Sequence, residues 1–189
     1  MSASDLKEKY VPRLLQLYKE SILPEMKKER GYSNDLAVPR LVKIVVNMGL
    51  GSVSSDPKAI EQLSGELAVI TGQKAKICRA RKPISNFKLR KGMGVGCCTT
   101  LRKSRMYEFL DRLITVAIPR IRDFRGFSSH AFDGSGNYAF GLAEQGIFPE
   151  INLDKVSRTQ GMNIVINTNA VSDEECRLLL EKFGFPFRR

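Results

Sequence analysis

The sequence predicts an α+β fold, with a mostly antiparallel mixed sheet, helices packed on one face and the other face left polar. Two hydrophobic periods support this. Residues 40–48 and 161–169 alternate apolar and polar side chains as strands do, whereas residues 57–71 and 104–117 repeat apolar side chains at helical spacing. The chain has 189 residues, of which 42% are hydrophobic, so it can bury a substantial core. We expect one domain over residues 1–189, with an N-terminal helical region at 1–37 and an α+β core at 38–189.

In residues 1–72 the sequence pattern predicts one or two N-terminal helices, then a strand, then another helix. Helical spacing over residues 5–26 predicts one or two short helices, in which Pro12 and Pro24 are candidates to break the helix or start a turn, followed by a surface turn at 27–31. In the strand at 40–48 the even-numbered residues from Val42 would face the core. Asp56 and Pro57 are typical of the start of a helix, which Gly72 would end.

The second half predicts four further strands and two helices. Residues 74–81 and 96–103 read as strands on either side of a basic loop, 82–91. Ser104 would cap a helix that ends near Pro119, and the glycine-dotted stretch 126–146 would form loops or small hairpins. A short edge strand is expected at 147–151, then the strand at 161–169 and a helix that starts after Ser172 and stops at Gly184.

The net charge is concentrated in one stretch. Between residues 67 and 107 there are eleven Lys and Arg residues and no carboxylate, while the rest of the chain balances 20 cations against 20 carboxylates. Cations without internal neutralisation repel one another, and a phosphate backbone would offset that cost. Apolar residues interrupt the run, unlike a disordered tail, although a merely solvated basic face is the alternative. The eleven are Lys74, Lys76, Arg79, Arg81, Lys82, Lys88, Arg90, Lys91, Arg102, Lys103 and Arg105.

Other chemistries find little support. The cysteines at 78, 97, 98 and 176 lack CxxC spacing and His130 is the only histidine, so we expect no metal and no cofactor. No nucleophile motif accompanies His130, and Gly49-Leu50-Gly51 lacks the third glycine of a dinucleotide loop, so we do not expect an enzyme. The N-terminal residues lack a signal-peptide pattern and no apolar run approaches the ~20 residues that span a bilayer, so we expect a cytoplasmic protein without a membrane partner.

The predicted polar face carries groups suited to RNA. Amides and hydroxyls beside cations can contact the backbone and 2′-hydroxyls of structured RNA, and the scarcity of aromatic residues on this face argues against single strands. A face that is simply solvated would show the same alternation. The side chains concerned are Lys43, Asn47, Thr100, Arg102, Asn163, Asn167 and Asn169.

Nine short blocks, in order along nearly the whole chain, resemble the family of bacterial large-subunit ribosomal proteins that bind 5S ribosomal RNA, number five in the large-subunit series. The longest block after the one at 38–49 is Ile118-Pro119-Arg120-Ile121-Arg122-Asp123-Phe124-Arg125-Gly126. The blocks occupy residues 38–49, 71–73, 87–90, 106–109, 118–126, 132–134, 136–138, 147–151 and 185–187.

This resemblance implies an α+β protein whose sheet lies against 5S ribosomal RNA in the central protuberance, in contact with 23S ribosomal RNA and neighbouring proteins there. It implies RNA contacts at Lys43, Asn47, Gln73 and Thr100, and Arg102 shares the strand face of Thr100. We therefore expect a non-enzymatic, structural component of the large subunit. The alternative is a generic RNA chaperone or nucleic-acid-binding protein without 5S specificity.

The resemblance also implies two further contacts. The basic loop, here residues 77–87 with flanking cations, would lie near the transfer RNA in the peptidyl site. The region from Asp123 to Glu150 would form a bridge to a protein of the small-subunit head. The loop candidates are Lys76, Arg79, Arg81, Lys82 and Lys88, and the bridge candidates are Asp123, Arg125, Asp133 and Glu150.

Overall fold

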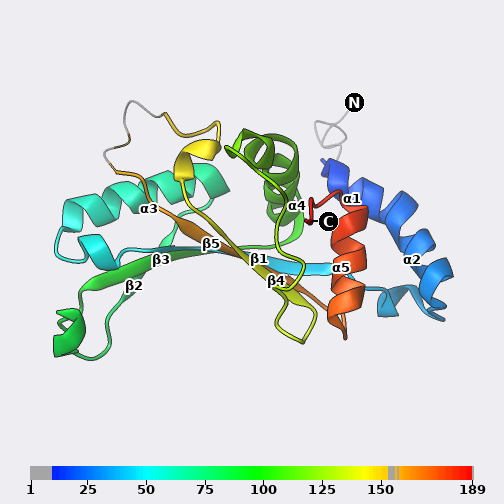
Figure 1. The fold of residues 1–189 in the computed structure, drawn as a ribbon, viewed down its shortest axis with the longest axis horizontal. Helices are drawn as coiled ribbons and strands as arrows, with labels where there is room; N and C mark the ends of the chain where they lie inside the picture. The colour runs from blue at the N-terminus through cyan, green and yellow to red at the C-terminus, as the bar shows by residue number, and fades with distance from the viewer. Residues whose placement is uncertain (1–9, 153–155, 157, 189) are drawn as a thin grey trace, which may run out of the picture.

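A five-stranded antiparallel sheet forms the centre of the computed structural model, which describes residues 10–152, 156 and 158–188 (Figure 1). The strand order is β2-β3-β1-β5-β4, and every neighbouring pair is antiparallel. The α+β prediction is confirmed, and these strands form an antiparallel rather than a mixed sheet. The strands are β1 (Leu41–Gly49), β2 (Lys76–Arg79), β3 (Gly94–Leu101), β4 (Asn137–Leu142) and β5 (Met162–Thr168).

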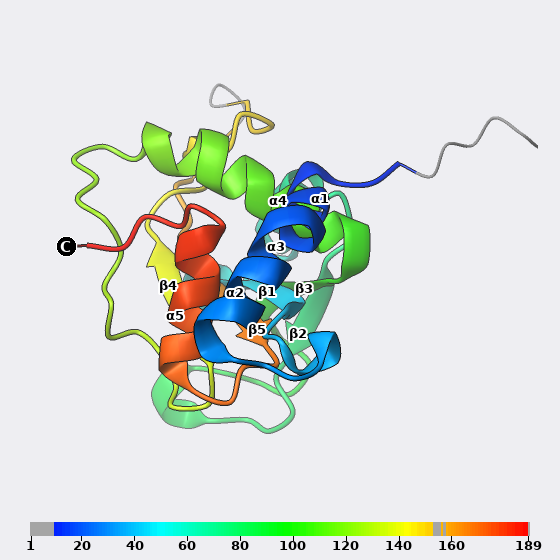
Figure 2. The same ribbon diagram turned by 90° about the vertical axis from the view of Figure 1, so that its right-hand side faces the viewer.

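The helices gather against one side of the sheet and at one end. Figure 1 shows α3 (Pro57–Thr71) and α4 (Lys103–Arg112) above the sheet, and Figure 2 shows α5 (Asp173–Lys182) beside the N-terminal helices α1 (Arg13–Leu17) and α2 (Leu23–Arg30). Of the helices in the described ranges, none combines the length and apolarity that crossing a membrane would require.

The N-terminal helices form one continuous helical run from 13 to 30. A π-helical turn, Tyr18–Ile22, joins α1 to α2 just before Pro24. Proline has no N–H for a normal helical bond, and the wider turn accommodates this defect without ending the helix. Pro24 therefore neither breaks the helix nor starts a turn, and the surface turn predicted at 27–31 is wrong, because the helix continues to Arg30 and ends at Gly31, which has φ 68°. Pro12 directly precedes the first helical residue, Arg13. Residues 5–9 of the predicted helix lie outside the described residues.

Charged side chains attach this helical run to the rest of the molecule. Arg13 donates hydrogen bonds to the Asp111 carboxylate on α4. Lys182 on α5 donates to Glu25 at 2.9 Å and to Glu29 at 2.8 Å. Hydrogen bonds to these carboxylates raise the pKa of Lys182.

Strand β1 follows the predicted alternation except at its start. Ile44, Val46 and Met48 are fully buried, but Leu41 is buried and Val42 is exposed, the reverse of the prediction. A register shift between Leu41 and Lys43 in the β1–β5 pairing explains the reversal, because a bulge of one residue moves the next side chain to the other face.

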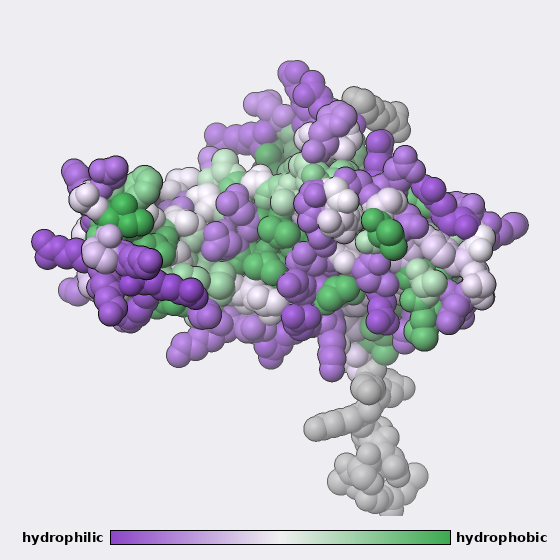
Figure 3. Space-filling model, turned by 90° about the horizontal axis from the view of Figure 1, so that it is seen from below, coloured by the Kyte–Doolittle hydropathy of each residue, from purple (hydrophilic) through white to green (hydrophobic). Residues whose placement is uncertain are grey.

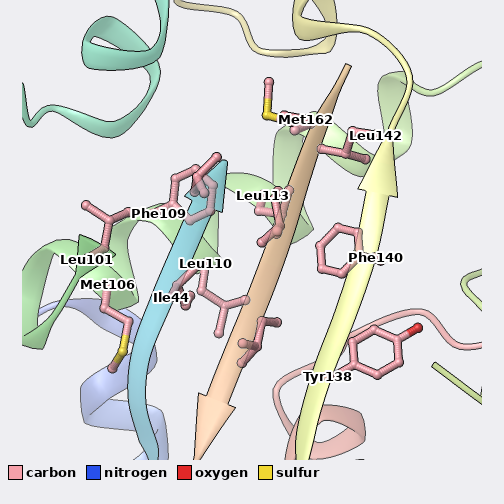
Figure 4. Packing of buried hydrophobic residues seen from close by; sticks show 14 of the residues in the cluster. Ile44, Leu101, Met106, Phe109, Leu110, Leu113, Tyr138, Phe140, Leu142 and Met162 are labelled. Atoms are coloured by element: carbon pink, nitrogen blue, oxygen red, sulfur yellow. The ribbon is translucent and has the colours of Figure 1, made fainter. Parts of the chain in front are cut away.

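The core lies between the sheet and α4. Figure 4 shows Met106, Phe109, Leu110 and Leu113 from the α4 segment among the buried residues of the strands. All four have at most 1% exposed surface. Ser104 does not cap this helix as predicted. The N-cap is Arg102, whose side chain makes no cap hydrogen bond, and Lys103 takes the left-handed φ of 53°. The helix continues as a π-helical turn, Leu113–Ala117, and a 3-10 turn, Ile118–Arg120.

The region from 126 to 151 departs most from the prediction. Its glycine-dotted stretch contains β4, whose inward residues Tyr138, Phe140 and Leu142 are buried. The strand predicted at 147–151 is absent. Phe148 N–H instead donates to the carbonyl of Gln145, and Ile151 N–H to that of Phe148, so this segment makes consecutive turns. Gln145 is buried, and its side-chain amide donates to the carbonyl of Arg158 and accepts from Gln160 N–H, which holds the turns in place.

The C-terminal residues close the fold. Ser172 accepts a hydrogen bond from Glu175 N–H, as the predicted capping box requires. Burial acts to raise the pKa of Glu175, but hydrogen bonds from the Tyr32 hydroxyl and from Val171 N–H outweigh it and lower the pKa. After Gly184, Phe185 packs among four other rings: Phe127, Tyr138, Phe140 and Phe187.

Candidate nucleic-acid interface

Cross-strand register aligns the predicted polar residues in rows on the sheet face opposite α3 and α4. One row runs across all five strands and consists of Lys76, Cys98, Asn47, Asn163 and Gly141. A second row places Thr100 opposite Val45, and Val45 opposite Val165. Figure 3 views this side of the molecule. Hydrophilic residues form its margins and the end that carries the basic loop, while less polar residues run through its centre.

The two polar β1 side chains on this face are available to an external partner. Lys43 and Asn47 are half-buried, and within the described part of the chain neither side chain has a hydrogen-bond or ion-pair partner. Three other asparagines have partners. Asn167 donates to Asn137 Oδ1 at 3.1 Å, and Asn169 Oδ1 accepts from Arg40 N–H. The sequence could not distinguish the available amides from these structural ones, because the latter depend on residues in other elements.

Gln73, Thr100 and Arg105 meet where β3 leads into α4. The Gln73 side chain donates to the Thr100 carbonyl at 3.4 Å and accepts from the Arg105 guanidinium at 3.4 Å. Arg102 and Lys103 are exposed beside them. The left-handed backbone at Lys103 costs about 1–2 kcal/mol for a non-glycine residue, and such strain is concentrated at functional sites in proteins. Arg105 belongs to the predicted basic stretch, but its contact with Gln73 was not foreseen.

The predicted basic loop is a folded excursion from the sheet edge. Ala80 N–H donates to the Met93 carbonyl and Gly92 N–H to the Ala80 carbonyl, so the loop closes at its base. Near its tip, Ile84 and Leu89 form an antiparallel bridge. The loop candidates Lys76, Arg79, Arg81, Lys82 and Lys88 are all exposed, and Lys88 adopts φ 51°. The loop therefore projects its cations from an ordered frame.

No ion pair neutralises any of the eleven cations of residues 67–107 within the described part of the chain, a condition that other exposed cations such as Lys19 and Lys28 share. All eleven are exposed. Throughout the described residues, none of them lies within 4.0 Å of a carboxylate, whereas Arg13, Lys27, Arg30, Arg112, Arg177 and Lys182 all form ion pairs. Surface cations left without partners form the electrostatic footprint of a polyanion-binding protein.

The predicted bridge residues fall into two kinds. Asp123 and Arg125 are exposed on the segment that follows α4, and Asp123 has φ 53°. This segment borders a groove of about 600 Å³, whose lining includes Phe124, Phe127 and Glu144.

The carboxylates of Asp133 and Glu150 have internal partners. Asp133 accepts from the N–H groups of Ser135 and Asn137 and from the Asn137 side chain, whose bond is the largest cause of its lowered pKa. Glu150 is ion-paired with Arg112. These two residues thus have structural roles that the sequence did not reveal.

Nothing in the described residues is arranged as a metal centre. Among residues 10–152, 156 and 158–188, no three His, Cys, Asp or Glu side chains lie close enough together to hold a metal ion. His130 is exposed, and its backbone N–H donates to the Ser128 hydroxyl in a local turn.

An antiparallel α+β fold with a half-polar sheet face and, among the described residues, exposed cations without ion-pair partners has the features of a basic protein that binds a polyanion such as RNA. Two models of the ribosomal L5 family match the chain: the model described as "Ribosomal protein L5" over residues 34–90, and that of the C-terminus of the same ribosomal family over residues 94–187. The chain belongs to the bacterial uL5 family of ribosomal proteins, which are not enzymes.

Curated relatives match over nearly the full chain. The large ribosomal subunit protein uL5 of Thermobifida fusca is 56% identical over 178 residues, which cover 94% of this chain and 93% of that protein. The uL5 protein of Aquifex pyrophilus is 53% identical over 188 residues, covering 100% and 99% of the two chains. That of Geotalea uraniireducens is 54% identical over 176 residues, covering 93% and 98%.

Proposed function

We propose that the protein is a structural component of the large ribosomal subunit that binds 5S ribosomal RNA with the polar face of its sheet. The observation that carries this proposal is the set of eleven exposed cations without carboxylate partners, next to a face on which Lys43 and Asn47 are unpartnered among the described residues. Phosphates would neutralise the cations, and amide and hydroxyl groups would contact the backbone and 2′-hydroxyls. In this position it would help attach 5S ribosomal RNA to 23S ribosomal RNA and to neighbouring proteins of the central protuberance.

We assign the two flanking regions to further partners. The basic loop, with an ordered base and exposed Arg81 and Lys82, would contact the transfer RNA in the peptidyl site. The exposed segment with Asp123 and Arg125, beside the groove lined by Phe124, would contact a protein of the small-subunit head. The groove supports this second contact because its lining combines aromatic rings with charged side chains, and protein interfaces contain both.

The first test is a gel-shift titration of the pure protein against 5S ribosomal RNA with excess transfer RNA as competitor. We expect the 5S complex to persist, and Asn47→Ala to weaken it by about 1–3 kcal/mol, the cost of leaving a buried hydrogen-bonding group unpaired. Gln16→Ala is the matched control, since it removes an exposed amide from α1, far along the chain from the interface. A complex erased by transfer RNA would support the generic RNA-binding alternative and refute 5S specificity.

A further inference from the structure

Two of the four cysteines touch each other on the proposed RNA face. Cys78 on β2 and Cys98 on β3 have their Sγ atoms 3.7 Å apart and are both half-buried. Cys78 pairs in register with Gly96, which has no side chain, so its thiol has room to lean toward Cys98. Cys98 itself stands between Lys76 and Asn47 in the row that crosses the sheet. The pair therefore lies in the middle of the residues assigned to RNA.

The other two cysteines have a different environment. Cys97 and Cys176 have no exposed surface, and burial raises the pKa of Cys97 to about 11 and that of Cys176 to about 12. Burial also raises the pKa of Cys98, while the ammonium group of Lys76 acts against that rise. Because the thiolate is the reactive form and needs access to its target, only the pair on the sheet face is suited to reaction.

The strand that carries Cys78 can move to close the remaining gap. A disulfide needs an S–S distance of about 2.05 Å, so the two sulfur atoms must approach one another from 3.7 Å. β2 is an edge strand of four residues, and its pairing with β3 shifts register directly after Cys78. A short edge strand with an interrupted ladder resists such a shift less than a central strand does.

We propose that Cys78 and Cys98 form a dithiol site that closes to an intramolecular disulfide by exchange with a low-molecular-weight disulfide, and that bound RNA covers this site. One cysteine thiolate attacks a sulfur of the small disulfide, whose S–S bond breaks and releases one small thiolate. The second cysteine thiolate attacks the mixed disulfide and releases the other. The two cysteine protons pass to the released thiolates, so the protein is oxidised by two electrons and the small disulfide is reduced to two thiols.

The free protein tests the dithiol directly. We incubate it with excess oxidised glutathione at neutral pH, alkylate the remaining thiols in denaturant so that the buried Cys97 and Cys176 also react, and measure the intact mass without reduction. We expect loss of two hydrogen atoms, no glutathione adduct, two alkylated thiols, and a cross-linked peptide joining residues 78 and 98 after digestion. Cys78→Ser and Cys98→Ser are the matched controls, and each should stop at a mixed disulfide or stay reduced. Four alkylated thiols, or stable adducts on the wild type, would overturn the proposal.

A second experiment tests whether bound RNA covers the Cys78–Cys98 site. This part of the proposal rests on the proposed function. In a preformed 5S complex, closure proceeds only through the free fraction, so about nine-tenths occupancy should slow it about tenfold. Closure at the free-protein rate in a verified complex would refute the placement of the pair beneath RNA. If no 5S complex forms, the proposed function fails, while the free-protein arm still decides the dithiol.

Discussion

The unpaired cations of the basic loop allow a test in which binding and stability respond differently. Arg81 and Lys82 are exposed and have no carboxylate within 4.0 Å in the described part of the protein. Replacing both with alanine removes two candidate phosphate contacts. The slope of log affinity for RNA against log salt concentration should become shallower by about 1.4 to 1.8, at 0.7 to 0.9 for each lost contact.

The same double variant should fold at least as stably as the wild type. Neither exposed side chain has a hydrogen-bond or ion-pair partner among the described residues, so the free energy of unfolding should change by no more than about 0.5 kcal/mol. At low salt it should rise rather than fall, because the substitutions relieve repulsion within the cluster, and this gain should fade as salt screens the charges.

The measurements are a labelled 5S ribosomal RNA titration at a series of KCl concentrations and urea unfolding in the same buffers. Lys19→Ala with Lys28→Ala is the matched control, because it removes two exposed cations from the N-terminal helices, unpaired among the described residues, and leaves the basic stretch intact. An unchanged slope in the loop variant, or an equal decrease in the control, would show that RNA does not recognise this cluster.

Three further predictions concern the folded state. Gly136→Ala places a Cβ 2.6 Å from the carbonyl oxygen of Ala170 at φ +72°, and should lower the free energy of unfolding by more than about 2 kcal/mol. Gly134→Ala, where the space is open, should lower it by about 1 kcal/mol. Equal losses of unfolding free energy for the two variants, measured by urea unfolding, would contradict this prediction. Phe185→Ala should cost about 3–5 kcal/mol in the same assay, since this ring is 3% exposed and packs among four others, and a loss below about 1 kcal/mol would refute that packing. Folding lowers the pKa of Glu175, so the wild type should have a higher free energy of unfolding than Glu175→Gln above the unfolded pKa of about 4.3. This difference should vanish as the pH falls through the lower folded pKa. A difference that does not depend on pH would exclude the linkage.

Elements with a clear hydrophobic period and local end signals could be predicted from the sequence. The strand around Ile44 and the helix between Pro57 and Gly72 were confirmed, because strict alternation and a cap are properties of neighbouring residues. β4 was missed because its outward positions Ala139 and Gly141 are small rather than polar, so the stretch resembled a loop. The apolar run at 147–151 was misread for the opposite reason, since contacts of the buried Gln145, not periodicity, decide its conformation.

Part of the candidate site could likewise be predicted from the sequence, and part could not. Lys43 and Asn47 could be placed on one face from the period of a single strand, and the structure leaves both available. The contact of Gln73 with Arg105 joins residues 32 positions apart, and the contact of Cys78 with Cys98 depends on the register of two strands. Register follows from the packing of the whole sheet, so a single sequence does not disclose these pairs.

The cations that form ion pairs and the eleven cations of the basic stretch affect the stability of the fold in opposite directions. The ion pairs of the described residues tie helices to their neighbours, as Lys182 does for α5 and α2, and exposed pairs of this kind contribute at most about 1 kcal/mol each. The eleven cations of residues 67–107 add repulsion and no such pair within the described ranges, so the apolar core must hold the fold together against them. Increasing salt should therefore weaken RNA binding steeply while it changes the stability of the free protein little, since several phosphate contacts depend on ion release and the fold depends on few charges. This asymmetry favours a protein whose cationic surface is built for a partner and is only tolerated when the partner is absent.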